Sequence, residues 1–277
     1  MNKTTLKIKM LYDKMGGAER KIADWIAENP KGLIPLSITE LAESCGCSEA
    51  TIVRFAKRLG LCGYQELKIS LAREEGTADL TNGIKPGDSC FEIFEKVSND
   101  IYCALEMTKK SLDRDALERA AEKILNAEQI MLYGLGNSAS VAIDFQHKLL
   151  RTGCRAVAFS DNHMQVISAS HLTGRDVAVG ISHSGSSRDI IDALAAAREC
   201  GATTVSISNK GKSPIVKVSD IALFTASNET EYTILGLNSR IAQLAIVNSI
   251  YYYIVNRKAV SSKAVELTER ALQSKKF

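Results

Sequence analysis

The sequence lacks any apolar run close to the roughly 18 residues that span a membrane, and Met1–Met10 alternates lysine with single apolar residues instead of forming the apolar segment of a signal peptide. It also has little net charge. The 35 Lys and Arg against 32 Asp and Glu leave +3, so binding to nucleic acid would need a local basic face. The seven cysteines are odd in number and irregularly spaced, which excludes an obvious disulfide framework. We therefore expect a soluble, reduced, cytoplasmic protein with no membrane partner.

The 277 residues correspond to a little under two domains at about 150 residues per domain. Up to Arg73 the pattern is helical, and Ala18–Asn29 places Ile22, Trp25 and Ile26 on one face. Gly76–Asp88 is small, polar and interrupted by glycine and proline, as a linker is. We predict a helical domain over residues 1–76, a linker over 77–88 and a second domain, with leading helices, over 89–277.

From Gln129 onwards, short apolar runs alternate with helical stretches such as Ser140–Arg151 and Asp189–Cys200. Strands buried on both faces that alternate with helices indicate a doubly wound parallel sheet. The fold class is therefore α plus α/β, with a five-stranded parallel sheet. The expected strands are Ile130–Tyr133, Arg155–Phe159, Val177–Ile181, Thr204–Ile207 and Ile221–Thr225.

Ala42, Gly46 and Ile52 have the spacing of a helix-turn-helix: a small residue, a turn glycine and an apolar anchor. Cys45 and Cys47 have no matching ligand pair nearby, so they are expected in the core and not as zinc ligands.

The second helix of this motif is expected to begin after Ser48 as N-cap. A turn of 100° per residue places Ala50, Arg54 and Lys57 opposite Ile52. Such a face suits the major groove of DNA, although a protein-interaction module with solvated charges remains the alternative. The predicted DNA-binding residues are Ser48, Ala50, Thr51, Arg54, Lys57, Arg58 and Lys68.

Two loops of the second half resemble phosphate-binding turns. Gly134–Ser140 has the start of a dinucleotide fingerprint, but Ala139 replaces its third glycine, so no nicotinamide cofactor is expected. Ser182–Asp189 places the hydroxyls of Ser182, Ser184 and Ser187 around Gly185 where a helix begins. Hydroxyls and the N–H groups of a helix start can hold a phosphate, although a serine-rich turn is often only a turn.

The run Thr51–Gly60, of the form Thr-x-x-Arg-Phe-x-x-x-Leu-Gly and followed by Gly63, Tyr64 and Lys68, resembles the N-terminal domain of RpiR-type (MurR/RpiR) transcriptional regulators. Residues 116–255 are similar to the SIS (sugar isomerase) domain of these proteins, with Ser182–Ser187 in place of its phosphate-binding motif. The resemblance implies a regulator of carbohydrate metabolism whose binding to operator DNA is controlled by a phosphorylated sugar.

The same resemblance implies the ligand-binding residues. Asn228–Tyr232 and Ser239–Leu244 resemble a family region that closes the sugar end of the site, where either Glu229 or Glu231 would approach the ligand. Phosphate contacts are implied for one set of serines and loop-lining positions for their neighbours: Ser138, Ser182, Ser184 and Ser187, with Gly136, Asn137, His183 and Gly185.

A sugar-phosphate isomerase is the alternative, because SIS domains also occur in enzymes. It would need a general base, and the candidates are His183, His147, Glu229 and Glu231. A DNA-binding half fused to an isomerase would be unusual, so we expect a regulator and not an enzyme, with no cofactor and no metal.

We also expect a homodimer or higher homo-oligomer, because one recognition helix reads only a few base pairs. The candidate contacts between subunits are Phe91–Leu105 and Tyr251–Val255, although both segments could equally belong to the core of one chain.

Overall fold

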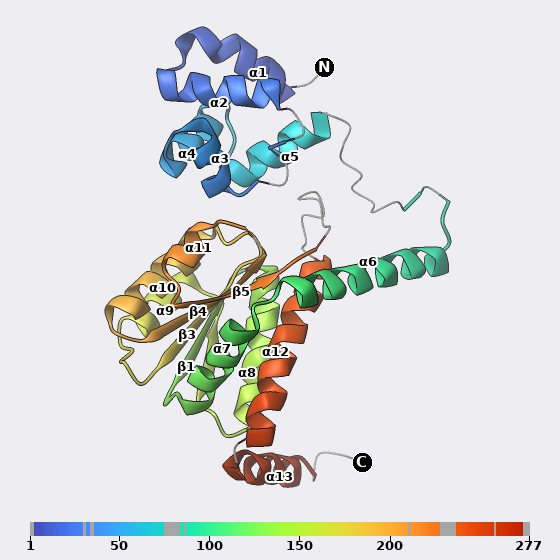
Figure 1. Ribbon diagram of the computed structural model, residues 1–277, viewed down its shortest axis with the longest axis vertical. Helices are drawn as coiled ribbons and strands as arrows, with labels where there is room; N and C mark the ends of the chain where they lie inside the picture. Colours follow the sequence, from blue (N-terminus) through green and yellow to red (C-terminus); the bar gives the residue numbers. More distant parts are fainter. Residues whose placement is uncertain are drawn as a thin grey trace. The chain divides into compact units, whose positions relative to one another are not determined.

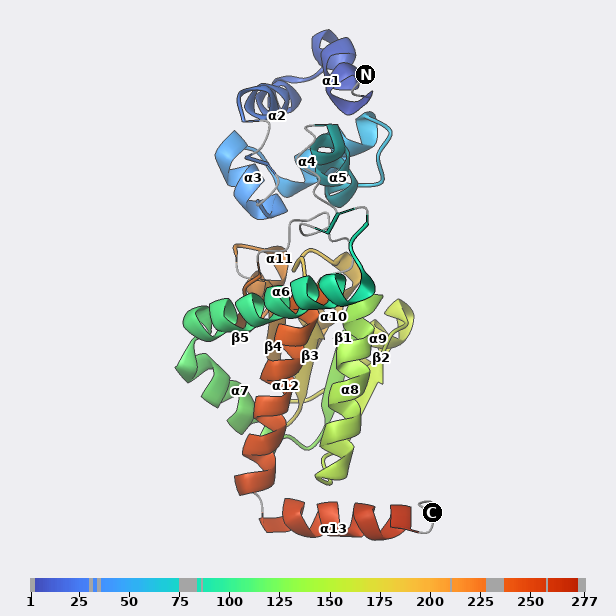
Figure 2. The same ribbon diagram turned by 90° about the vertical axis from the view of Figure 1, so that its right-hand side faces the viewer.

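The computed structural model describes residues 3–29, 32–33, 36–74, 84–85, 87–209, 211–227, 237–257 and 259–273. The chain divides into two compact units (Figures 1 and 2). Unit 1 holds residues 1–100 with 211–213 and 228–236, and unit 2 holds the rest. Most of the predicted linker lies outside the described residues, so the boundaries 1–76, 77–88 and 89–277 stay a prediction.

Unit 1 is helical, as predicted. Its core is a cluster of completely buried side chains that includes Ile22, Leu41, Ile52, Phe55 and Leu67. The elements up to residue 74 are α1 (Lys3–Leu11), the 3₁₀ turn η1 (Tyr12–Lys14), α2 (Gly17–Glu28), α3 (Ile38–Cys45), α4 (Glu49–Arg58) and α5 (Tyr64–Glu74).

Unit 2 is built on a five-stranded parallel sheet of order β2-β1-β3-β4-β5, which confirms the predicted fold class. Two leading helices precede it, α6 (Cys90–Ser111), which extends across the boundary between the units, and α7 (Arg114–Asn126). The strands are β1 (Ile130–Gly134), β2 (Ala156–Phe159), β3 (Val177–Ile181), β4 (Thr203–Asn209) and β5 (Ile221–Thr225). The other helices are α8 (Asn137–Arg151), α9 (Asn162–Ala169), α10 (Arg188–Glu199), α11 (Pro214–Lys217), α12 (Leu237–Arg257) and α13 (Ala259–Gln273).

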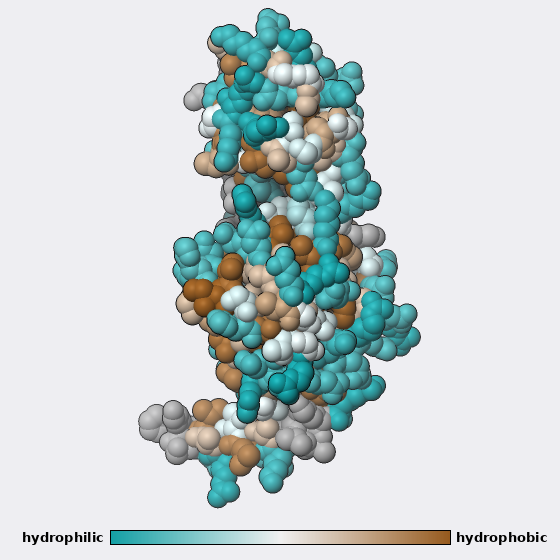
Figure 3. Space-filling view, turned by 90° about the vertical axis from the view of Figure 1, so that its left-hand side faces the viewer, coloured by the Kyte–Doolittle hydropathy of each residue, from teal (hydrophilic) through white to brown (hydrophobic). Residues whose placement is uncertain are grey.

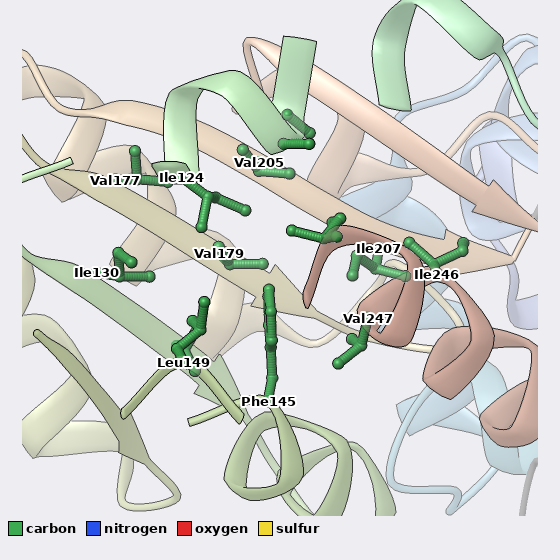
Figure 4. Close-up of a cluster of buried hydrophobic side chains, with 14 of the residues drawn as sticks. Ile124, Ile130, Phe145, Leu149, Val177, Val179, Val205, Ile207, Ile246 and Val247 are labelled. Atoms are coloured by element: carbon green, nitrogen blue, oxygen red, sulfur yellow. The ribbon is translucent and has the colours of Figure 1, made fainter. Parts of the chain in front are cut away.

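Helices cover both faces of the sheet (Figure 1). On one face, α7, α8 and α12 pack their apolar side chains on the strands, with Phe145, Ile246 and Val247 around Ile207 (Figure 4). On the other face lie α9, α10 and α11, which contribute Ala169, Ile190 and Ile215 among others to a second cluster. Because strand residues alternate between faces and both faces are covered, the strands are mostly apolar, although β4 also carries the buried polar residues Thr204, Ser206 and Ser208.

β2 is an edge strand, and a side chain occupies part of its free edge. The Gln146 Oε1 atom on α8 accepts the Ala158 N–H at 2.5 Å. Val157 of the same strand is 43% exposed. Near this edge, α9 leaves Met164, Val166 and Ile167 exposed. Figure 3 shows that one side of the molecule carries hydrophobic side chains among polar ones.

None of the described helices is long and apolar enough to cross a membrane.

Candidate functional sites

The loops after β1 and β3 leave the sheet in opposite directions. β1 and β3 are neighbours in the sheet, and β1 leads into α8 on one face while β3 leads into α10 on the other. In open α/β sheets, the crevice between two such loops at the carboxyl ends of the strands is where ligands bind. Both serine-containing loops singled out in the sequence meet at this point.

The loop after β3 is folded by its own serines. The Ser182 and Ser187 hydroxyls are 3.1 Å apart and hydrogen-bonded, although five residues separate them. Ser184 Oγ accepts the Ser186 N–H at 3.2 Å, so its own hydroxyl proton can still be donated. Gly185 has φ +62°, a conformation that favours glycine, and its carbonyl accepts the Ile215 N–H at 3.0 Å. The loop is thus a closed turn with hydroxyls on it.

The loop after β1 depends on two glycines. A Cβ atom on Gly134 would lie 2.6 Å from the Ser138 carbonyl oxygen, so only glycine permits this close turn. Gly136 is the N-cap of α8, with φ 54° and ψ −126°. Few residues other than glycine adopt such angles.

The two helices that begin at the crevice have no side-chain cap. α7 and α9 begin at Asp113 and Asp161, whose carboxylates accept N–H groups of the first turn. α8 begins at a glycine, and the Ser187 N-cap of α10 makes no capping bond. The first N–H groups of a helix have no partner within the helix, and they attract anions. The start of α10, beside the Ser182 and Ser187 hydroxyls, is therefore suited to a phosphate.

Sequence reasoning missed Gln165, which holds the crevice in place. This completely buried side chain on α9 donates through Nε2 to the Phe159 carbonyl at 2.8 Å and to the Gly134 carbonyl at 3.2 Å. It therefore joins the carboxyl ends of β1 and β2. A single glutamine in a helical stretch carries no signal that would have identified it.

The other residues predicted to bind ligand, or to act as a base, lie in different surroundings. Ser182 is buried and Ser138, His183, Ser184 and Ser187 are partly buried around the two loops. Glu229 and Glu231 lie outside the described residues. His147, a candidate base for the isomerase alternative, is exposed on α8, which leads away from the crevice.

Unit 1 contains the predicted helix-turn-helix. Gly46 ends α3 in a left-handed conformation with φ 60°, and the Ser48 hydroxyl accepts the Thr51 N–H at the start of α4. Ile52 is completely buried between the helices, while Arg54 and Lys57 are exposed on the opposite face. The predicted helix face is therefore reproduced by the structure.

Five of the predicted DNA-binding residues, Ser48, Thr51, Arg54, Arg58 and Lys68, make side-chain contacts within unit 1. Thr51 is buried, and its hydroxyl contacts Ser48 and accepts from Arg54. Arg58 is ion-paired with Glu19. Among these residues, Lys68 differs most from the exposed position expected of a residue that contacts DNA.

The Lys68 side chain is 1% exposed, and its ammonium donates to the Leu36 carbonyl below the Tyr64 ring. Burial lowers the pKa of this ammonium to about 7, and the Glu40 carboxylate opposes that shift. This placement corrects the prediction that Lys68 contacts a phosphate of DNA, because the ammonium points into the protein.

Residues 2–77 match the helix-turn-helix domain of the rpiR family, and residues 123–252 match the SIS domain. An uncharacterised HTH-type transcriptional regulator of Caldanaerobacter subterraneus subsp. tengcongensis is 39% identical over 87% of this chain and 86% of its own length. The chain belongs to the RpiR family of transcriptional regulators.

Two further relatives show how far the resemblance extends. HexR, an HTH-type transcriptional regulator of Pseudomonas aeruginosa, is 33% identical to this RpiR-family regulator over 92% of this chain and 90% of its own. The solved structure of Vibrio vulnificus NanR complexed with ManNAc-6P is 26% identical and covers 99% of this chain and 100% of its own, with a TM-score of 0.83. The similarity to both proteins thus extends along nearly the whole chain.

Proposed function

We propose that this RpiR-family regulator binds operator DNA through α4 and that a phosphorylated sugar bound between the β1 and β3 loops controls that binding. The observation that carries the ligand half is the uncapped start of α10 beside the bonded Ser182 and Ser187 hydroxyls. The NanR complex with ManNAc-6P, a sugar phosphate, supports the same class of ligand. The crevice offers hydroxyl and N–H donors, which suit a phosphate, and we propose no catalytic role for it.

We expect Ser184→Ala to weaken binding of the phosphosugar about ten- to a hundredfold, because a hydrogen bond to a charged group contributes roughly 1.5–3 kcal/mol. A thermal-shift screen of phosphorylated sugars and sugar acids supplies the ligand for the titration. Ser170→Ala is the matched control, since the Ser170 hydroxyl is exposed and bonds only the Ile167 carbonyl of its own helix. DNA binding without ligand should be unchanged in both variants. Superimposable titrations of wild type and Ser184→Ala would exclude this loop from ligand binding.

We expect Arg54→Ala to weaken operator binding by about 1–3 kcal/mol and to relax the sequence preference, because Arg54 is exposed on the face of α4 opposite Ile52. The probe is a DNA fragment that the wild-type protein selects from a random-sequence library. Arg114→Ala, at an exposed arginine of unit 2, is the control and should bind as wild type does. A folded Arg54→Ala protein with unaltered affinity would contradict the assignment of this face.

We further propose that the protein binds DNA as a homodimer. α6 supports this, because it exposes three aromatic side chains: Phe91, Phe94 and Tyr102 are 68%, 64% and 63% exposed. Apolar side chains grouped on an exposed surface often mark a protein–protein contact. The operator titration also gives the stoichiometry. Two chains per operator at saturation are expected, and one chain would contradict the dimer.

A further inference from the structure

Two of the buried polar atoms of unit 2 that have no hydrogen-bond partner among the described residues are at the end of β4 and near the start of α12. They are Oδ1 of Asn209, the last residue of β4, and Nε2 of Gln243, in the second turn of α12. Gln243 is 2% exposed. Buried polar atoms without a partner are rare in native proteins, and each costs free energy unless a ligand or water satisfies it.

Both side chains lie on the same face of the sheet. Val205 and Ile207 of β4 point towards α12, and strand alternation gives Asn209 the same direction. α12 runs back along the sheet, against the direction of the strands, and brings Ile246 and Val247 onto Ile207 (Figures 1 and 4).

The two residues also lie at similar positions along the direction of the strands. Gln243 is three residues before Ile246, which is about 5 Å along a helix, and Asn209 is two residues beyond Ile207, about 6–7 Å along a strand. Both steps lead from the same contact towards the carboxyl ends of the strands, where the crevice lies.

Asn209 connects this pair to the proposed phosphate site. Its backbone N–H donates to the His183 carbonyl at 2.9 Å, so it lies beside the Ser182–Ser187 loop. A ligand whose phosphate is held by that loop would therefore lie close to Asn209.

The two atoms are complementary but are not bonded to each other. Oδ1 accepts a hydrogen bond and Nε2 donates one, and a hydroxyl group is a small group that does both. We propose that Asn209 and Gln243 together bind one hydroxyl of the sugar, and that this contact distinguishes a sugar phosphate from phosphate alone. The proposal rests on the function proposed above and assigns the recognition of the sugar to two named atoms.

The test compares dissociation constants for inorganic phosphate, glucose 6-phosphate and N-acetylmannosamine 6-phosphate in wild type, Asn209→Ala, Gln243→Met and the double variant. Each single variant should bind the preferred sugar phosphate about three- to tenfold more weakly, because one hydrogen bond is lost, and should bind inorganic phosphate within twofold of wild type. If one hydroxyl contacts both residues, the double variant should lose less than the product of the two single losses.

An unchanged preference for sugar phosphate in Gln243→Met, with a raised melting temperature, would mean that only water satisfies the two atoms and would overturn the proposal. So would a wild-type protein that binds both sugar phosphates no better than phosphate. Failure of the phosphate site itself is recognised separately, because Ser184→Ala would then leave binding of inorganic phosphate unaltered. Asn209→Ala, at a strand end, keeps the test valid if Gln243→Met does not fold.

Discussion

Gly134→Ala is expected to lower the unfolding free energy of unit 2 by about 3 kcal/mol, at the upper end of what overpacking costs, and to abolish measurable binding of phosphosugar. The added Cβ would lie 2.6 Å from the Ser138 carbonyl oxygen and 3.0 Å from the Ala139 nitrogen, which are backbone atoms and cannot rotate away. The turn between β1 and α8 must therefore open. Chemical denaturation followed by circular dichroism and a ligand titration measure the two effects.

Gly174→Ala is the control for this substitution. Gly174 lies in the same unit, and its Cβ would be 3.6 Å from the Gly201 carbonyl oxygen, an ordinary contact. This variant should be as stable as wild type within about 0.5 kcal/mol and should bind ligand normally. A Gly134→Ala protein that behaved in the same way would show that the β1 turn is not as close as described.

The stability of unit 1 is expected to rise by a few kcal/mol between pH 7 and 10, through Lys68 alone. The pKa of Lys68 is lowered to about 7 in the folded protein, whereas an unfolded lysine has a pKa near 10.4. Between these values the unfolded chain binds a proton that the folded chain does not, so the free energy of unfolding increases with pH. Below about pH 7 both states are protonated, and the contribution no longer changes.

Lys68→Met separates this effect from other titrating groups, because methionine fills similar space without a charge. The Leu36 carbonyl keeps a donor in this variant, since the Tyr64 hydroxyl also donates to it at 2.8 Å. Denaturation should be followed by tryptophan fluorescence, because the single tryptophan, Trp25, packs against the core of unit 1. The free energy of unfolding of wild type should increase relative to that of Lys68→Met as pH rises. If the free energies of unfolding of the two proteins changed in parallel from pH 6 to 10, the lysine could not be buried and neutralised as described.

Hydrophobic patterning predicted the fold because the central strands of unit 2, β3 above all, are buried on both faces. The predicted ranges Val177–Ile181 and Ile221–Thr225 are those observed, and β4 extends the predicted Thr204–Ile207 only at its ends. The region up to Arg73 was predicted to be helical, but no individual helix was placed at Lys3–Leu11. Lys3–Leu11 has weak amphipathic patterning, and contacts distant in sequence hold it, such as the bonds from Thr5 to the Glu74 carboxylate.

The local geometry of the candidate sites agrees with the sequence-based expectation where a short motif sets it, while the roles of the residues in binding stay predictions. The turn at Gly46, the cap at Ser48 and the Ser182–Ser187 loop are all fixed within a few residues. Lys68 was misjudged because a lysine in a basic stretch gives no sign that its ammonium turns inwards. Gln165 was not assigned, because its role depends on strands far away along the chain. Gln243 lies within Ser239–Leu244, which the family resemblance placed at the sugar end of the site, but no individual role was assigned to it.

The free edge of β2 also bears on how copies of this protein can associate. An exposed strand edge with open N–H groups recruits further strands and leads to open-ended growth. Here the Gln146 side chain already occupies the Ala158 N–H, so one of the positions that an added strand would use is taken. Exposed side chains such as Val157 and Ile167 remain available for contacts with another copy. A two-fold symmetric contact between such surfaces uses the same patch on both copies, so no further copy can be added through it. The Gln146 contact therefore makes this edge a poorer template for a further strand.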